Sequence, residues 1–214
     1  MQNLIPKQRG DTLIEVMFAI TVFSFVVVGA LSLMNQGSSA AQRSLEITLV
    51  RQEMDAQAEA LRFMHGAYTA SYQSGVEPNL SDAVTSPAEE FYRVVQRAKA
   101  YPVTSASELG VNDGKTCQTP PSGNFILNPR EARFEINRYA PAETFAQLEY
   151  DGSGTFLRSS GLWIEALRVA PLASDPNQSG VGYIDFHIRA CWSAPGLSAP
   201  VNLGKIVRLY EPRA

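Results

Sequence analysis

Two residues in the C-terminal half have the types and spacing that could support hydrolysis. Asp185 and His187 are two positions apart in an alternating stretch, so both side chains would lie on one face of a strand. An acid can orient a histidine as the general base for a nearby serine. The chain, however, contains no Gly-x-Ser-x-Gly, no phosphate-binding loop and no His-Glu-x-x-His. We therefore predict a packed or surface histidine at position 187, no catalytic site, and a protein that is not an enzyme.

Metal and cofactor chemistry has equally little support. The chain has two cysteines and two histidines, so a four-ligand zinc site would need additional ligands or carboxylates in the right places. No dinucleotide-binding fingerprint is present. The net charge is −3, from 18 basic and 21 acidic residues, which gives no bulk attraction for nucleic acid phosphates. We predict no metal, no cofactor and, by bulk charge, no nucleic acid partner.

A further residue is unusual because of where it lies. Glu15 stands at the start of an uncharged apolar run from Val16 to Met34, which reads VMFAITVFSFVVVGALSLM. Its length of about 19 residues is close to the ~20 that cross a bilayer as a helix. The run is apolar on all sides, whereas a helix in a soluble core usually keeps a polar face. We predict a membrane helix, in which a carboxylate costs on the order of 2.5–3.5 kcal/mol at the centre and less near the interface.

The flanking charges predict the orientation of this helix. Lys7 and Arg9 precede it, and the next basic residue is Arg43. Positive charge holds the N-terminal end in the cytoplasm, so we expect a single pass of the cytoplasmic membrane with the rest of the chain outside. Alternatives are a buried soluble helix, an interfacial Glu15 that contacts lipid headgroups, and a secretory signal cleaved near the small residues 38–40.

The segment KQRGDTLIEV, residues 7–16, resembles the N-terminal signal of type IV pilins and of the pseudopilins of type II secretion. In that family a short basic leader ends in Gly, and a Glu stands five residues into the mature chain. The match includes Gly10, Thr12, Leu13, Ile14, Glu15 and Val16. The resemblance implies that a prepilin peptidase cleaves between Gly10 and Asp11, that the new amine of Asp11 is methylated, and that Glu15 pairs with such an amine on a neighbouring subunit.

The resemblance therefore implies a structural subunit that assembles with other pilin subunits through its N-terminal helix, at a membrane assembly platform, into a cell-surface or periplasmic filament. Two departures favour a minor pilin or pseudopilin over a bulk subunit. The first mature residue would be Asp11, where the family usually has Phe, and the apolar run lacks proline. The alternative is a signal-anchored extracytoplasmic binding protein that does not polymerise.

The pattern after the apolar run predicts how these parts are organised. We expect a leader over residues 1–10, a membrane and assembly helix over 11–35, an amphipathic continuation over 36–66 that ends near His65 and Gly66, and a globular head over 67–214. The apolar stripes of the continuation are Leu45, Leu49, Ala56, Ala60 and Phe63, with Ile47, Val50, Met54 and Leu61 beside them.

Within the head, local signals predict one helix and several strands. Ser86-Pro87-Ala88-Glu89 has the composition of a capping box and predicts a helix over about 87–100. Alternating or β-branched runs predict strands over 132–136, 145–150, 155–158, 163–169, 183–192 and 205–210. The fold class is therefore α+β, a long helix packed on an antiparallel sheet, which is the lollipop shape that the resemblance also implies.

Cys117 and Cys191 form the one possible pair of cysteines in the chain. Outside the cytoplasm we expect a disulfide between them, and a loop of this length would stabilise the fold by roughly 4 kcal/mol. Two free buried thiols are the alternative.

Overall fold

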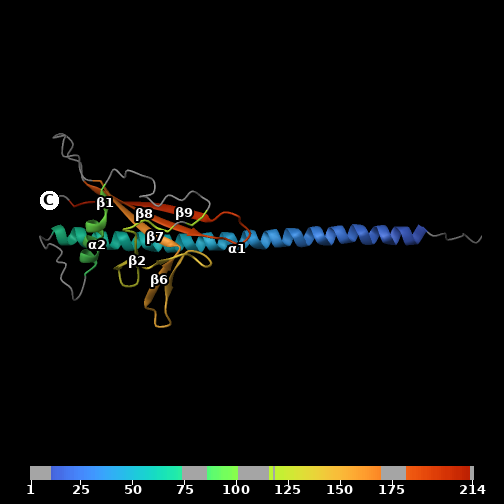
Figure 1. The fold of residues 1–214 in the computed structure, drawn as a ribbon, viewed down its shortest axis with the longest axis horizontal. Helices are drawn as coiled ribbons and strands as arrows, with labels where there is room; N and C mark the ends of the chain where they lie inside the picture. Colours follow the sequence, from blue (N-terminus) through green and yellow to red (C-terminus); the bar gives the residue numbers. More distant parts are fainter. Residues whose placement is uncertain (1–10, 74–85, 101–115, 118, 170–181, 213–214) are drawn as a thin grey trace, which may run out of the picture. The chain divides into compact units, whose positions relative to one another are not determined.

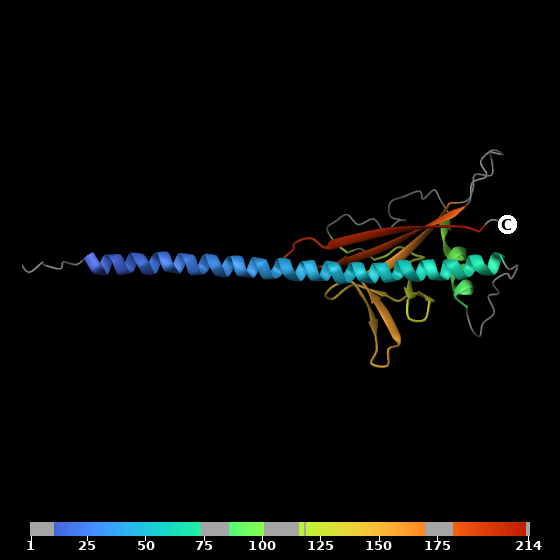
Figure 2. The ribbon, with the colours of Figure 1, turned by 180° about the vertical axis from the view of Figure 1, so that it is seen from behind.

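The computed structural model describes residues 11–73, 86–100, 116–117, 119–169 and 182–212. By its internal contacts the chain divides into two units, one ending at Leu45 and the other covering Glu46–Ala214. The elements are α1 (Asp11–Gln73), α2 (Pro87–Arg97), β1 (Lys99–Ala100), β2 (Phe125–Asn128), β3 (Arg133–Ile136), β4 (Tyr139–Ala140), β5 (Gln147–Tyr150), β6 (Phe156–Ser160), β7 (Leu162–Val169), β8 (Tyr183–Trp192) and β9 (Val201–Tyr210). Figures 1 and 2 show them from opposite sides.

Helix α1 has 63 residues, which corresponds to a length of about 95 Å. It continues to Gln73, so the predicted end near His65 and Gly66 is wrong. The reason lies in the packing of the following turn. Tyr68 is buried, and its ring lies 5.4 Å from the ring of Phe91 on α2. This tertiary contact outweighs the weak helix propensity of the single glycine.

Of the two predicted apolar stripes of α1, the second is the more deeply buried, although Ala60 of the first stripe also reaches the core at 8% exposure. Val50, Met54 and Leu61 are 0–3% exposed, as predicted for the second stripe. Leu45 and Phe63 of the first stripe are each 61% exposed. The buried face of this half of the helix is completed by Ala58 and Met64, which continue the second stripe at helical spacing.

A buried glutamine joins α1 to strand β2. The side chain of Gln57 is fully buried; its Nε2 donates to the Leu127 carbonyl at 2.9 Å, and its Oε1 accepts from the Leu127 amide at 3.0 Å. β2 pairs with β7 only at Phe125 and Ile164. On this side of β2, the side-chain amide of Gln57 therefore bonds to the backbone groups of Leu127 in place of a neighbouring strand. The contact fixes the helix against the sheet in one register.

The main sheet has the strand order β3-β2-β7-β8-β9, and β1 pairs with β7 in parallel. The other pairings are antiparallel, which confirms the predicted α+β arrangement of a long helix on a largely antiparallel sheet. β8 alternates clearly: Ile184, Phe186 and Ile188 are buried in the core, whereas Asp185 and His187 lie on the other face. Strands β1, β2 and β4 were not predicted.

Helix α2 begins as its sequence predicts and ends three residues earlier, at Arg97. Ser86 Oγ accepts from the Glu89 amide at 3.3 Å, and the Glu89 carboxylate accepts from the Ser86 amide at 2.7 Å. The next residue, Glu90, is 2% exposed, and its carboxylate accepts from the Phe134 amide at 3.0 Å. α2 thereby covers the β3 edge of the main sheet.

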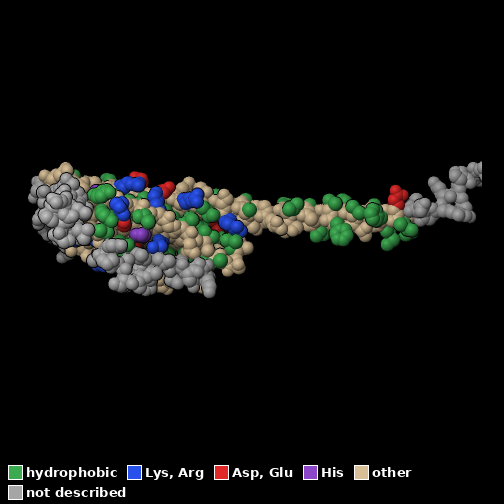
Figure 3. Space-filling view, turned by 90° about the horizontal axis from the view of Figure 1, so that it is seen from above, with side chains coloured by type: hydrophobic (Ala, Val, Ile, Leu, Met, Phe, Trp, Pro, Cys, Tyr) green, Lys and Arg blue, Asp and Glu red, His purple; other side chains and the backbone are tan. Residues whose placement is uncertain are grey.

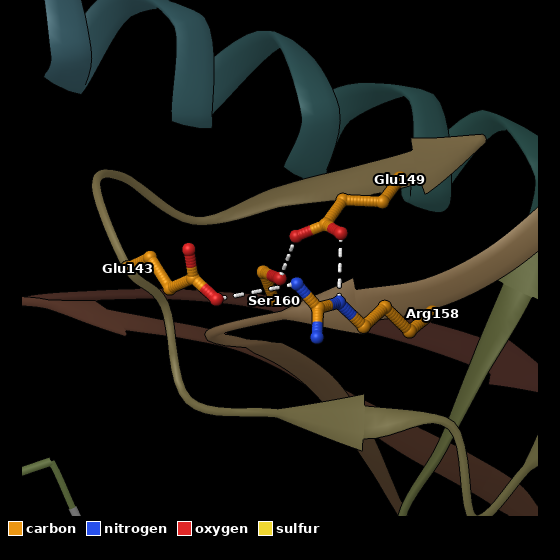
Figure 4. Close-up of polar contacts among 4 residues, drawn as sticks. All are labelled: Glu143, Glu149, Arg158 and Ser160. Carbon is orange, nitrogen blue, oxygen red and sulfur yellow. Dashed lines mark hydrogen bonds and ion pairs between the residues drawn. The ribbon is translucent and has the colours of Figure 1, made fainter. Parts of the chain in front are cut away.

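A second sheet, β4-β6-β5, carries a polar network that Figure 4 shows. Arg158 donates from Nε to Glu149 at 2.7 Å and from Nη2 to Glu143 at 3.4 Å, and Ser160 donates to the other oxygen of Glu149. These hydrogen bonds hold the pKa of Glu149 below its ordinary value, with the bond from Arg158 as the largest cause. The network ties together the strands β5 and β6 and the loop before them.

Cys117 and Cys191 form a disulfide with their Cα atoms 5.6 Å apart, as predicted. Cys191 is fully buried on β8, so the bridge attaches a segment 74 positions away to a central strand of the sheet. The two free thiols of the alternative interpretation are therefore not present.

Candidate assembly site in the N-terminal helix

The first unit of the chain contains an apolar helical surface that no other described residue covers. The large apolar side chains between positions 13 and 34 are exposed to between 38% (Val27) and 80% (Phe25). Figure 3 shows hydrophobic side chains along this half of α1. Among the described residues, this is the one helix that is long and apolar enough to cross a membrane, and its most apolar stretch is 0% buried. A soluble core helix would be mostly buried, so the observed exposure favours lipid or neighbouring helices.

Two of the three hydroxyl side chains between positions 16 and 34 bond back to the helix. Thr21 Oγ1 donates to the Phe18 carbonyl at 2.7 Å, and Ser24 Oγ donates to the Ile20 carbonyl at 2.7 Å. These bonds satisfy the two donors without water, which suits a helix in hydrocarbon.

Glu15 is the exception on this surface. It lies in the first turns of α1, it is exposed, and its neighbours Ile14 and Val16 are 71% and 55% exposed. No ion pair to Glu15 forms within the part of the chain that the structure describes. A carboxylate in this position is costly when the helix leaves water, unless it is paired with a cation.

The other residues of the predicted site are placed only in part. Asp11 begins α1, but its side chain, like Gly10 and the leader over 1–10, lies outside the described residues. The structure therefore does not test cleavage after Gly10, methylation of Asp11 or pairing of Glu15, and these remain predictions.

The residues that were considered for hydrolysis take part in contacts within the fold. Arg208 donates two hydrogen bonds to Asp185, both at 2.7 Å. His187 is half-buried beside it; burial and then the nearby Arg189 lower its pKa, although Asp185 opposes this. The sequence predicted that His65 lies at a helix end. In the structure it lies within α1, and its Nε2 forms a hydrogen bond with the Tyr210 carbonyl at 2.8 Å. No group of three or more potential metal ligands occurs within the described ranges.

Sequence reasoning missed two features that position these elements. Gln57 stands between alanines in an amphipathic stretch, and nothing local shows that it contacts a strand 70 positions away. Glu90 follows the capping acid Glu89 and was not distinguished from it, although only Glu90 is buried. The only sequence signal for their burial is the helical spacing of the apolar residues, because Gln57 and Glu90 each lie on the apolar face of their helix.

Comparison with known proteins gives one match. The family described as "Prokaryotic N-terminal methylation motif" matches residues 5–31, which include the basic leader, Gly10, Glu15 and most of the apolar run. No curated protein and no solved structure is similar enough to this chain to count as a match. The motif supports the resemblance recognised from the sequence, and the α+β arrangement behind it is that of a pilin-like chain. The protein is thus a type IV pilin-like protein with an N-terminal methylation motif and an apolar N-terminal helix.

Proposed function

We propose that this chain is a minor pilin-like structural subunit of a type IV pilus or of a type II secretion-type pseudopilus. The observation that carries the proposal is the exposed apolar half of α1 with Glu15 at its start, most of which lies within the matched methylation motif. Such a surface needs lipid before assembly and neighbouring helices afterwards. The role is structural, and no catalytic step is assigned to the folded unit.

In this proposal, processing controls assembly. Prepilin peptidase cleaves between Gly10 and Asp11 and removes Lys7 and Arg9 with the leader. The new α-amino group then stands four residues from Glu15, about one helical turn away. It becomes the cation that the Glu15 carboxylate of an adjacent subunit contacts. In the uncut chain the amine lies ten residues farther out on a charged leader, so the pair cannot form.

The pairing also sets the energetic demand on Glu15. Two charges that enter a low-dielectric filament core compensate each other, whereas an unpaired one is strongly unfavourable. Removing one partner of a buried pair costs about 3–5 kcal/mol per contact. The apolar surface around Glu15 supplies the general attraction, and the ion pair specifies the axial register between subunits.

Assembly in the native membrane tests the proposal. We expect Glu15→Leu to be inserted and processed but to be absent from sheared, sedimentable filaments. Ser24→Leu is the matched control, since it also removes a polar side chain from the same exposed helix but leaves the charge in place. Normal incorporation of Glu15→Leu into filaments would contradict the proposed pairing.

Two further observations separate processing from assembly. N-terminal sequencing of the mature chain should begin at Asp11, and the mass of the N-terminal peptide reports whether that residue is methylated. Replacement of Gly10 by a bulky residue should retain the leader, which is seen as unchanged mass of the precursor. A mature chain that still begins at Met1 would exclude the peptidase step.

The alternative function is a single-pass anchored extracytoplasmic binding protein that does not polymerise. The exposed apolar helix is compatible with it, because a simple anchor has the same surface. The Glu15→Leu variant discriminates between the two, since an anchor tolerates the change and a filament subunit does not.

A further inference from the structure

A groove of about 610 Å³ lies in the folded unit beside helix α1. The helix forms one wall, and the first residue of α2 and the loop between β2 and β3 form the others. Figure 1 shows α2 and β2 beside this part of α1. The groove is largely apolar, and its apolar residues are Ala56, Ala60, Phe63, Pro87, Pro129 and Ala132.

The helix wall combines a hollow with an exposed aromatic ring. Ala56 and Ala60 are one turn apart, and their methyl groups leave space that a larger side chain would fill. Phe63 follows on the same face and is 61% exposed. All three belong to the first predicted stripe of α1, which the fold covers at Ala60 but not at Phe63. This wall therefore fits a large apolar side chain from outside the fold.

The opposite wall is held in place by the contacts of Arg130. Its amide donates to the side chain of Asn128 at 3.2 Å. Its guanidinium lies 3.7 Å from the centre of the Tyr150 ring and donates to the Gly154 carbonyl at 3.3 Å. Burial raises the pKa of Glu53 on α1, and the nearby Arg130 opposes this rise. Among the described residues, the one cation that lines the groove is therefore already engaged by the surrounding fold.

The other charged residues that line the groove are acidic, with Glu59 on the helix wall and Glu131 on the loop wall. Their side chains are 71% and 52% exposed. Each has an arginine nearby that does not line the groove: Arg62 bonds to one oxygen of Glu59, and Arg133 stays 3.8 Å from Glu131. Ion pairs this exposed contribute little, so both carboxylates remain available to another cation. The rim of the groove is therefore acidic and favours a basic partner.

Charge argues against a second copy of this chain as the occupant. Within the apolar helix over 13–34, the one charged residue is Glu15, which an acidic rim would repel. In the folded unit, the exposed side chains of Leu157 and Ile206 stand near cations. Those cations already bind carboxylates of their own fold: Arg158 to Glu149, Lys205 to Asp55 and Arg208 to Asp185. A different polypeptide is therefore the better occupant.

We propose that this groove docks a segment of another polypeptide in which a large apolar side chain is flanked by Lys or Arg. The apolar side chain occupies the hollow of the helix wall and packs against Phe63. The flanking cations pair with Glu59 on one wall and with Glu131 on the other. The groove lies entirely within Glu46–Ala214, so docking here does not depend on the assembly proposed for the N-terminal helix.

Site-specific cross-linking of the full chain in its native membrane tests this. A photoreactive phenylalanine analogue replaces Phe63, and the cross-linked residues are mapped by mass spectrometry. The same analogue at Leu157, which is also exposed but does not line the groove, is the control. We expect a yield at position 63 about tenfold above that at 157, and a partner sequence with Lys or Arg beside the cross-linked residue. No excess at 63, a partner segment without basic residues, or cross-links to a second copy would overturn the proposal.

Two pairs of variants separate the contribution of charge from that of shape. Glu131→Lys reverses one rim charge and should lower the yield from position 63 about tenfold, whereas Glu143→Lys makes the same change at an exposed glutamate outside the groove and should not. Ala56→Leu fills the hollow and should also lower the yield, whereas Gln52→Leu, one turn earlier on the helix, should not. Thermal unfolding and an intact disulfide verify the fold of all four variants. Equal yields within either pair would refute the docking mode.

Discussion

Replacement of Gln57 by leucine should uncouple helix α1 from the sheet without removing any apolar contact. Gln57 is fully buried and satisfies both backbone groups of Leu127, which is itself fully buried. Leucine has nearly the same volume but offers neither a donor nor an acceptor. The variant therefore leaves one amide and one carbonyl of β2 unpaired in the core.

The size of the effect follows from these two groups. A buried donor or acceptor that loses its partner costs about 1–3 kcal/mol, so the pair costs about 2–6 kcal/mol. Burying leucine in place of an amide returns part of this, on the order of 1–2 kcal/mol. From the midpoints of the two ranges, the net loss should be about 2.5 kcal/mol. For a folded unit of this size, that lowers the melting temperature by roughly 5–10 °C.

The assay is thermal and chemical unfolding of the oxidised full chain in detergent micelles, followed by tryptophan fluorescence. Both tryptophans, Trp163 and Trp192, are at most 2% exposed and lie in the folded unit. Gln52→Leu is the control, because Gln52 is an exposed glutamine of the same helix and should shift stability by less than about 0.5 kcal/mol. If Gln57→Leu unfolded with the same midpoint as Gln52→Leu, the proposed clamp would carry no energy and the reasoning would fail.

Three other perturbations have defined outcomes. Ser86→Ala removes the N-cap of α2 and should cost about 1 kcal/mol in the same unfolding assay, whereas loss of less than a few tenths would contradict the cap. Replacing Cys117 and Cys191 together by alanine should cost roughly 4 kcal/mol relative to the oxidised wild-type chain, and the reduced wild-type chain should be about as stable as the variant. The hydrogen bond from Arg158 lowers the pKa of Glu149 in the folded state, so its stabilisation is present above the ordinary pKa of 4.5 and is lost as the pH falls through the lowered value. Glu149→Gln should flatten this acid limb of the stability profile, and an unchanged limb would show that the ion pair does not contribute.

Local signals in the sequence predicted the elements that local chemistry controls. The capping box at Ser86 and Glu89 fixed the start of α2, because both bonds form within one turn. β8 was predicted over its full length, since its alternation reflects one core face and one polar face. The apolar run after Glu15 was also identified, because its length and composition alone indicate a helix that is stable in lipid.

Features that depend on distant contacts could not be predicted. Helix α1 passes Gly66 because Tyr68 packs on α2, and that contact is absent from any local window. β1 and β4 have two residues each and exist only through parallel pairing to longer strands, so they have no period to detect. β2 reads as a short apolar run in a turn-rich region, and its buried position depends on Gln57.

The shared direction of α1 and β9 determines how the folded unit bears mechanical load. Bonds at Asp55, Gln57 and His65 attach the helix to the sheet at three successive levels along its axis. Tension applied along the helix therefore acts on all three in shear, at the same time, and does not open them one after another as peeling would. A chain built in this way resists axial pulling better than sideways displacement of its helix.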